Sequence, residues 1–87
     1  MRTGYLTIGT NPDGAKIYVN NILVVDEKCK PVTTPVTLAV SVGYHNIRLE
    51  LEGYLDEFDG QYILENYTVS IYFLCISYEI NLSLSNY

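Results

Sequence analysis

The stretch Asn11-Pro12-Asp13-Gly14-Ala15 decides the fold, because it separates two runs in which apolar and polar residues alternate. Proline presets φ for the second position of a turn, aspartate bonds to nearby backbone groups, and glycine accepts positive φ. Ala15 then offers a small side chain where the next run begins. These residues predict a tight turn between two β-strands, with Gly14 at positive φ.

A phosphate-binding loop is the alternative interpretation of this stretch. Such a loop needs consecutive backbone N–H donors, the N-terminus of a following helix, and usually a lysine and a hydroxyl at fixed offsets. Here Pro12 lacks an N–H group, Gly14 is the single glycine of the stretch, and a strand-like run follows. The stretch is therefore interpreted as a turn.

Alternation of apolar and polar residues continues along most of the chain, as in half-buried strands. It covers residues 5–10, 15–20, 22–25, 36–42, 45–52 and 69–75. Turn-forming residues separate the runs at intervals of roughly 8–12 residues, which is typical of a sandwich or a small barrel. Those after the first turn are Asn20-Asn21, residues 31–35, Gly43, Gly53 and Asp59-Gly60. The sequence thus predicts an all-β fold, a small antiparallel β-sandwich of about 6–8 short strands with no significant helix.

The phase of the alternation also predicts the core, because successive side chains of a strand point to opposite faces. We expect ten apolar side chains to be buried: Leu6, Ile8, Ile17, Val19, Leu38, Val40, Ile47, Leu49, Val69 and Ile71.

Length and charge limit the classes of function. The 87 residues carry a formal charge of −5, with scattered basic residues, so we expect no nucleic-acid partner. Residues 1–76 are expected to form one domain, and residues 77–87 an additional C-terminal strand or tail. No apolar run approaches the roughly 18–20 residues of a membrane span, and the first residues lack the apolar stretch of a signal peptide. This leaves a cytosolic protein or part of a longer exported one, and the abrupt ends favour the second.

Six stretches, taken in order, resemble the PEGA domain family. Residues 12–15 are similar to its Pro-Glu-Gly-Ala signature, with Asp13 in place of glutamate. The others are residues 4–8, residues 17–20, Thr34-Pro35, Gly43 with His45 and Ile47, and Gly53-Tyr54. The segment 26–32 departs from the family pattern, because it is longer and lacks a glycine before Thr33. The resemblance implies a small all-β sandwich that serves as a module of envelope or cell-surface proteins, with binding or spacer roles and no enzymatic activity.

His45 is the single histidine, so a catalytic triad or a zinc site would have to be built around it. It shares its place in the alternation with Ile47 and Leu49, which favours packing at a strand start and a bond to a backbone carbonyl. A Cys29–His45 pair is the arrangement that a small hydrolase could use, but no third group to orient it is evident. We predict no catalytic residue and no cofactor. Whether Cys29 and Cys75 form a disulfide stays open, with two free thiols and a buried Cys75 favoured.

Three carboxylates, those of Asp56, Glu57 and Asp59, are the candidate metal ligands. A calcium loop places its oxygen ligands at alternate positions and ends in a bidentate glutamate. Here the spacing differs and Phe58 intervenes. A solvated acidic loop is favoured, and a weak site for a divalent cation is the alternative.

Tyr18 and Tyr72 are the candidate ligand-binding residues among the nine tyrosines. Both alternate with apolar neighbours and are expected to face outward, where a ring with a polar tip suits sugar or protein recognition. Tyrosine is also common in strands without any such role. The structural turn residues are expected to be Pro12, Asp13, Gly14, Gly43 and Gly53.

Together these features predict a non-catalytic β-sandwich module of a larger surface or envelope protein. It would bind protein or carbohydrate, or act as a spacer, with other domains of the same polypeptide, another surface protein or a glycan as partners. A calcium-stabilised surface module and a small cysteine/histidine hydrolase are the alternatives. Residues 77–85 place Tyr78, Ile80, Leu82 and Leu84 on one face of a further strand. We expect self-association through this segment, or its pairing with an edge of its own sandwich.

Overall fold

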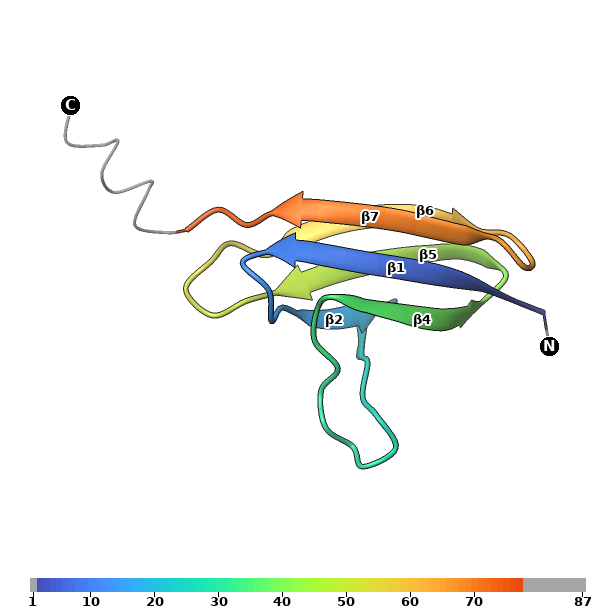
Figure 1. Cartoon of the computed structure of the whole chain (residues 1–87), viewed down its shortest axis with the longest axis horizontal. Coiled ribbons are helices and arrows are strands. Elements are labelled where there is room, and N and C mark those ends of the chain that lie inside the picture. The colour runs from blue at the N-terminus through green and yellow to red at the C-terminus, as the bar shows by residue number, and fades with distance from the viewer. Residues whose placement is uncertain (1, 78–87) are drawn as a thin grey trace.

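The computed structural model describes residues 2–77, which form seven strands. The strands are β1 (Thr3–Asn11), β2 (Lys16–Val19), β3 (Ile22–Leu23), β4 (Val36–Ser41), β5 (Gly43–Glu50), β6 (Glu57–Ile63) and β7 (Thr68–Leu74). They lie in two layers, with β1 and β7 in front of β5 and β6 (Figure 1). The all-β prediction is confirmed, and the described part of the chain contains no helix that is long and apolar enough to cross a membrane.

One layer is a three-stranded sheet with the order β4-β1-β7, and the other is a four-stranded sheet with the order β3-β2-β5-β6. β1 pairs antiparallel with β4, where Leu6 lies opposite Leu38, and parallel with β7, where Leu6 lies opposite Val69. The other pairs are antiparallel. The β1–β7 pair therefore departs from the purely antiparallel sandwich that the sequence predicts. Parallel neighbours need a long crossover connection, and here the strands between β1 and β7 supply it.

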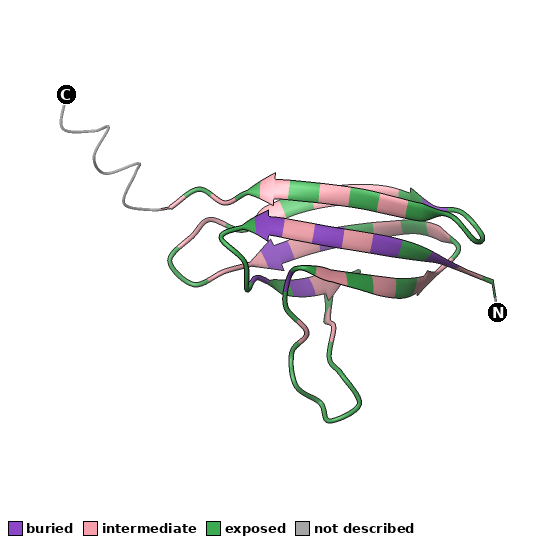
Figure 2. Ribbon diagram, in the orientation of Figure 1, coloured by how far each residue is buried: buried purple, intermediate pink, exposed green. Residues whose placement is uncertain are grey.

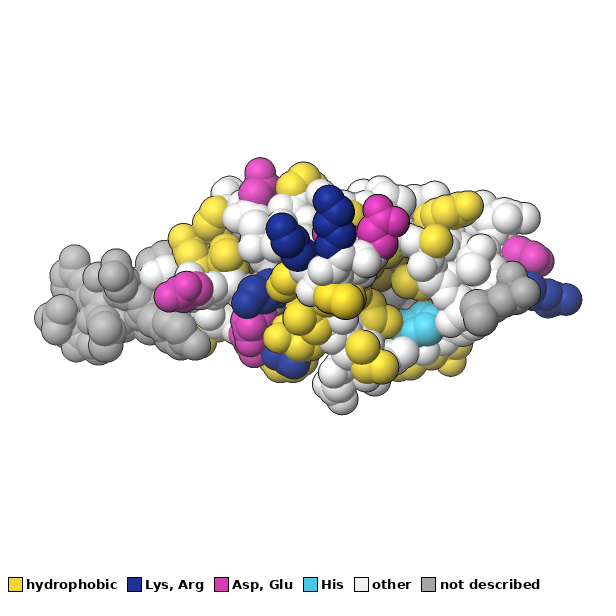
Figure 3. All heavy atoms as spheres, turned by 90° about the horizontal axis from the view of Figure 1, so that it is seen from below, with side chains coloured by type: hydrophobic (Ala, Val, Ile, Leu, Met, Phe, Trp, Pro, Cys, Tyr) yellow, Lys and Arg dark blue, Asp and Glu magenta, His cyan; other side chains and the backbone are white. Residues whose placement is uncertain are grey.

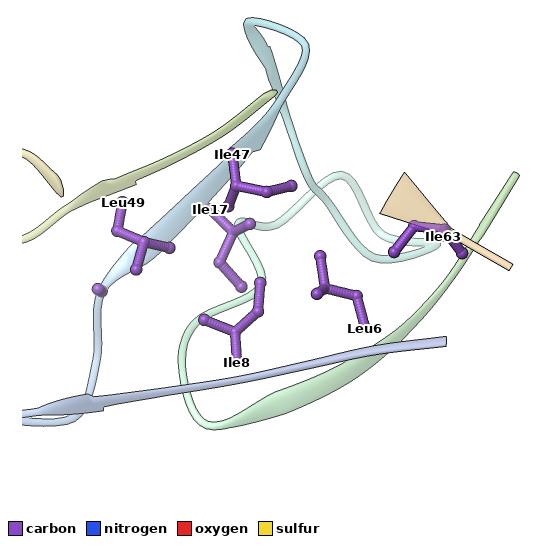
Figure 4. Packing of buried hydrophobic residues seen from close by; sticks show 7 residues of the cluster. Leu6, Ile8, Ile17, Ile47, Leu49 and Ile63 are labelled. Atoms are coloured by element: carbon purple, nitrogen blue, oxygen red, sulfur yellow. The ribbon is translucent and has the colours of Figure 1, made fainter. Parts of the chain in front are cut away.

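The core lies between the two sheets. Leu6 and Ile8 of β1 point at Ile17, Ile47, Leu49 and Ile63 of the opposite sheet (Figure 4). Figure 2 shows how buried and more exposed residues alternate along β1. Five of the ten predicted core residues are buried, namely Leu6, Ile8, Ile17, Ile47 and Leu49. The other five, Val19, Leu38, Val40, Val69 and Ile71, are half-buried against this cluster. Four of them lie on β4 and β7, which within residues 2–77 are edge strands with a neighbour on one side only.

Four of the predicted turns contain residues at positive φ. Gly14 has a φ of 102°, which confirms the interpretation of residues 11–15 as a turn. Asn20 and Asn21 have φ values of 52° and 68°, and positive φ at both central residues defines the two-residue hairpin turn that matches the twist of paired strands. Gly43 and Gly53 also have positive φ, 132° and 86°.

One predicted turn is wrong. Asp59 and Gly60 lie in the middle of β6, opposite Ile47 and Asn46 of β5, and the supposed acidic loop is largely a strand. An Asp-Gly pair favours a turn locally, but pairing with β5 decides the conformation here. Glycine in a strand often marks a close approach of another group, which here is the Tyr44 side chain.

A buried hydrogen-bond chain joins the first turn to the segment that leads into β4. The Ala15 N–H donates to Thr34 Oγ1 at 3.0 Å, and Thr10 Oγ1 donates to the Pro12 carbonyl at 2.8 Å. The Thr10 proton is thereby used, so the 2.6 Å contact between the two hydroxyls has Thr34 as its donor. Thr10 and Thr34 are both buried, and this chain satisfies their polar atoms.

Candidate functional site

Exposed aromatic rings lie on the outer side of the four-stranded sheet. Tyr44 on β5 and Phe58 and Tyr62 on β6 have exposed fractions of 52%, 70% and 69%. Tyr44 lies opposite Tyr62, and their rings pack edge to face with centroids 5.1 Å apart. These positions alternate with inward-facing residues of the same strands, so the three rings project to one side. We call Tyr44, Phe58 and Tyr62 the aromatic face.

Gly60 allows this packing. It lies between Phe58 and Tyr62 on β6, and a Cβ atom at this position would collide with the Tyr44 hydroxyl. The Tyr44 side chain therefore lies across the bare backbone of Gly60. The aromatic face is thus mounted on two paired strands, which restrains its rings before any ligand arrives.

A hollow of about 500 Å³ lies beside the aromatic face. It is lined by Asn21, Asn46, Ile47, Phe58, Asp59 and Gly60. Amide side chains both donate and accept hydrogen bonds, while the ring of Phe58 offers an apolar wall. The arrangement therefore suits a ligand that has an apolar side and a rim of polar groups.

Tyr18 belongs to the same outer surface, but its ring is already covered. The guanidinium carbon of Arg48 lies 3.8 Å from the ring centroid, a cation–π contact. Arg48 Nη1 is also 3.6 Å from carboxylate oxygens of Glu50 and Asp56. Tyr18 is half-buried, and Arg48 occupies the ring face that a ligand would use.

Tyr72 lies on the other sheet. It projects from β7 beside Gly9 and has an exposed fraction of 64%. The two tyrosines predicted to bind a ligand therefore lie on different sheets, and the structure does not bring them together.

The three candidate metal ligands also have separate surroundings. Asp56 faces Arg48, and Asp59 accepts a 2.6 Å hydrogen bond from Gln61 Nε2. Asp59 also lies opposite Ile47, on the inward side of β6. Within residues 2–77, no group of three or more histidine, cysteine or acidic side chains is placed to hold a metal ion.

His45 has both ring nitrogens engaged. Nε2 lies 2.8 Å from the Ser41 carbonyl oxygen, which can only accept, so Nε2 carries the proton. Nδ1 then accepts from Asn20 Nδ2, also at 2.8 Å. The predicted bond to a backbone carbonyl is confirmed, and in this arrangement both ring nitrogens are engaged by other residues of the protein.

The two cysteines are free thiols. Cys29 is exposed in the loop between β3 and β4, which projects from the sandwich (Figure 1). The ring nitrogens of His45 are bonded to Asn20 and Ser41, so the structure shows no Cys29–His45 pair. Cys75 is half-buried rather than buried as predicted. Desolvation raises the pKa of the Cys75 thiol, and the nearby Glu57 carboxylate raises that pKa further.

Charges of both signs share the surface on the side of this projecting loop. Figure 3 shows Lys and Arg side chains beside Asp and Glu side chains there, with apolar and uncharged groups between them. This side of the molecule therefore offers no single-sign patch that would select a strongly charged ligand.

Sequence reasoning missed the aromatic face, because Asp59-Gly60 was interpreted as a turn. The signal was present in the alternation of Phe58, Gly60 and Tyr62, where glycine takes the place of an outward side chain. Its pairing with Tyr44 depends on the register between β5 and β6, which the local pattern does not give.

Two packed sheets, a core of aliphatic side chains and an exposed aromatic surface define a small β-sandwich module. The model of the PEGA domain family matches residues 3–74, from the first residue of β1 to the last of β7, and the chain belongs to this family. PEGA domains are generally non-catalytic modules and typically occur in exported or periplasmic proteins. Curated protein sequences gave no match to the chain.

Proposed function

We propose that this PEGA domain is a non-catalytic binding module of an extracellular or envelope protein, and that its aromatic face binds a carbohydrate. The observation that supports this most is the placement of three exposed rings on two paired strands, beside a hollow lined by amide groups. Because these strands form part of the folded sandwich, little conformational freedom is lost when a ligand binds.

Carbohydrate chemistry fits both parts of the surface. One side of a pyranose ring is a patch of C–H groups that stacks on an aromatic ring, and its rim is a set of hydroxyl groups. The exposed rings of Phe58 and Tyr62 suit the first, and the side chains of Asn21 and Asn46 suit the second. The formal charge of −5 disfavours acidic glycans, so a neutral sugar is the proposed ligand.

Titration of the isotope-labelled protein with neutral oligosaccharides tests this function. We expect the backbone amide signals of Asn46 and Gly60 to shift, since these residues line the hollow. Phe58→Ala and Tyr62→Ala should each weaken binding about tenfold, the loss typical of an important contact residue.

Tyr72→Ala is the matched control, because Tyr72 is about as exposed as Tyr62 but lies on the other sheet. It should leave the affinity unchanged. If no neutral oligosaccharide shifts these signals, or if Tyr72→Ala weakens binding equally, the proposal is wrong, and a spacer or protein-binding role replaces it.

A further inference from the structure

β7 is an edge strand without the usual protection against pairing. Its sequence from Thr68 to Leu74 contains no charged residue and no proline. The other edges differ, since β3 has two residues, β6 carries Glu57 and Asp59, and β4 begins directly after Pro35. Short strands, charges and prolines are the devices that normally keep an edge from recruiting another strand.

The direction of the backbone groups of β7 follows from its pairing with β1. The Tyr5 N–H donates to the Tyr67 carbonyl at 2.8 Å, and the Cys75 N–H donates to the Asn11 carbonyl at 3.0 Å. In a parallel ladder, each residue directs its N–H and C=O groups to the same side, and this side alternates along the strand. The odd-numbered residues of β7 therefore face β1, and Thr68, Ser70, Tyr72 and Leu74 direct their backbone groups to the free edge.

The inner side of β7 is also incompletely covered. Val69, Ile71 and Phe73 pack against the core but stay half-buried, because no strand lies beyond β7 among residues 2–77. A further strand with apolar side chains on its inner face would cover their open flank.

Residues 78–85 of this chain have the composition and length of such a strand. Tyr78, Ile80, Leu82 and Leu84 alternate with polar residues, and one acidic residue, Glu79, falls on the polar face. At about 3.3 Å per residue, these eight residues would extend about 26 Å, and the seven residues of β7 about 23 Å. The two lengths agree within one residue.

The residues that follow β7 are already paired with other parts of the chain. The Cys75 N–H is bonded toward β1, the Ile76 carbonyl accepts from the Leu55 N–H at 2.9 Å, and Ser77 forms an antiparallel bridge with Tyr54. Tyr54 and Leu55 lie between β5 and β6 of the opposite sheet. A hairpin back onto β7 of the same copy would have to break these contacts.

We propose that residues 78–85 of one copy of this chain add as a strand to the free edge of β7 in a second copy. Reciprocal exchange of the two segments gives a closed dimer with two-fold symmetry. The interface is separate from the aromatic face, because β7 belongs to the other sheet.

The interface has two parts, the free edge of β7 and the added strand, and two variants remove one part each. A chain that ends at Ser77 keeps the edge and loses the added strand. Ser70→Pro keeps the added strand but removes one N–H group from the free edge, while the bonds to β1 stay intact. Ser70→Ala is the control, because it retains that N–H group.

The molar mass of each is measured by light scattering over a range of concentrations, with circular dichroism to verify folding. We expect the full chain and Ser70→Ala to reach twice the monomer mass as concentration rises, and both test variants to stay monomeric. An equimolar mixture of the two test variants should form a heterodimer, because residues 78–85 of Ser70→Pro can add to the intact edge of the truncated chain. This heterodimer should be weaker than the dimer of the full chain, since it holds one strand addition in place of two.

Three results would overturn the proposal: a full chain that stays monomeric, a truncated chain that still dimerises, or a mixture that forms no complex. If the truncated chain does not fold, Leu82→Asp with Leu84→Asp in the full chain takes its place in the mixture. Glycan binding by the aromatic face is measured separately, so failure of one proposal does not decide the other.

Discussion

A side chain at Gly14 would destabilise the fold through backbone strain, and not through collision with other atoms. Its φ is 102°, and a Cβ atom there would meet no other atom within 4 Å. We expect Gly14→Ala to lower the free energy of unfolding by about 1–2 kcal/mol, the usual penalty for an L-residue in left-handed backbone. Urea titration measures it. Asp13→Ala, at an exposed neighbour, should change stability by less than about 0.5 kcal/mol. Equal stability of both variants would mean that the turn does not require glycine.

The two thiols should differ in reactivity. The thiolate is the nucleophile, and burial together with Glu57 raises the pKa of the Cys75 thiol above its ordinary value. Near pH 8 we expect an alkylating reagent to modify exposed Cys29 several-fold faster than Cys75, as followed by mass spectrometry. The difference between the two alkylation rates should narrow at pH values above the raised pKa of Cys75.

The raised pKa of the Cys75 thiol also makes the stability of the fold depend on pH. The folded state holds the Cys75 proton to higher pH than the unfolded chain does, so this contribution to stability falls as pH rises through the ordinary thiol range. Cys75→Ser should remove that part of the pH dependence. A Cys75 that is labelled as fast as Cys29 would contradict the raised pKa.

Among the elements, those fixed by local chemistry were predicted and those fixed by pairing were not. The hairpin between β2 and β3 follows from Asn20-Asn21, whose side chains tolerate the positive φ of the turn. β6 was missed, because Asp59-Gly60 has the local signature of a turn. The parallel contact of β1 with β7 joins residues more than sixty positions apart, and no local pattern encodes it.

The burial of Leu49 follows from the register of β5 with its neighbours β2 and β6. Leu49 is buried in the core, and we expect Leu49→Ala to cost about 2–5 kcal/mol of unfolding free energy through the cavity that it leaves. Leu74→Ala removes the same atoms from a side chain that is 67% exposed, so it should change stability by less than about 0.5 kcal/mol. Denaturant unfolding of both variants measures the difference. Similar losses would show that Leu49 does not face the core.

The loop between β3 and β4 has its own organising residue. Asp26 Oδ1 accepts from the backbone N–H groups of Lys28 and Lys30, at 2.8 and 3.0 Å. Asp26→Ala should expose these two amides to rapid hydrogen exchange, while global stability changes by less than about 0.5 kcal/mol, because the loop tip opens independently of the core. Asp26→Asn keeps one acceptor and should retain most of the protection. If the alanine variant lowers global stability strongly, the loop unfolds together with the sandwich.

At the scale of the whole molecule, the sequence indicated a sandwich but not the location of its candidate site. The alternation of residues 45–52 predicted which side chains of that run face outward, but the neighbours that complete the surface come from β6 and from the turn after β2. Tyr18 was correctly predicted to face outward, yet its cover by Arg48 depends on the pairing of β2 with β5. A surface assembled from several strands is known only when their register is known.

Hydrogen bonds of Thr34 connect the two sheets. Thr34 precedes β4 of one sheet and receives the N–H of Ala15, directly before β2 of the other, while its own hydroxyl donates to Thr10 of β1. Thr34→Val keeps the shape of the side chain but leaves the Ala15 donor and the Thr10 acceptor unsatisfied in a buried place. We expect a loss of about 1–3 kcal/mol in unfolding free energy.

Thr34→Ser retains the hydroxyl and should recover most of the loss, which separates hydrogen bonding from packing. The double variant Thr10→Val/Thr34→Val should cost less than the sum of its single variants. It leaves only the Ala15 N–H and the Pro12 carbonyl unmatched, whereas each single variant also leaves the remaining hydroxyl without its partner. Thermal or urea unfolding of the unmodified protein, the two single valine variants and the double variant completes this double-mutant cycle. Additive losses would mean that the two hydroxyls act independently, and that the first turn and the segment before β4 are held together by packing alone.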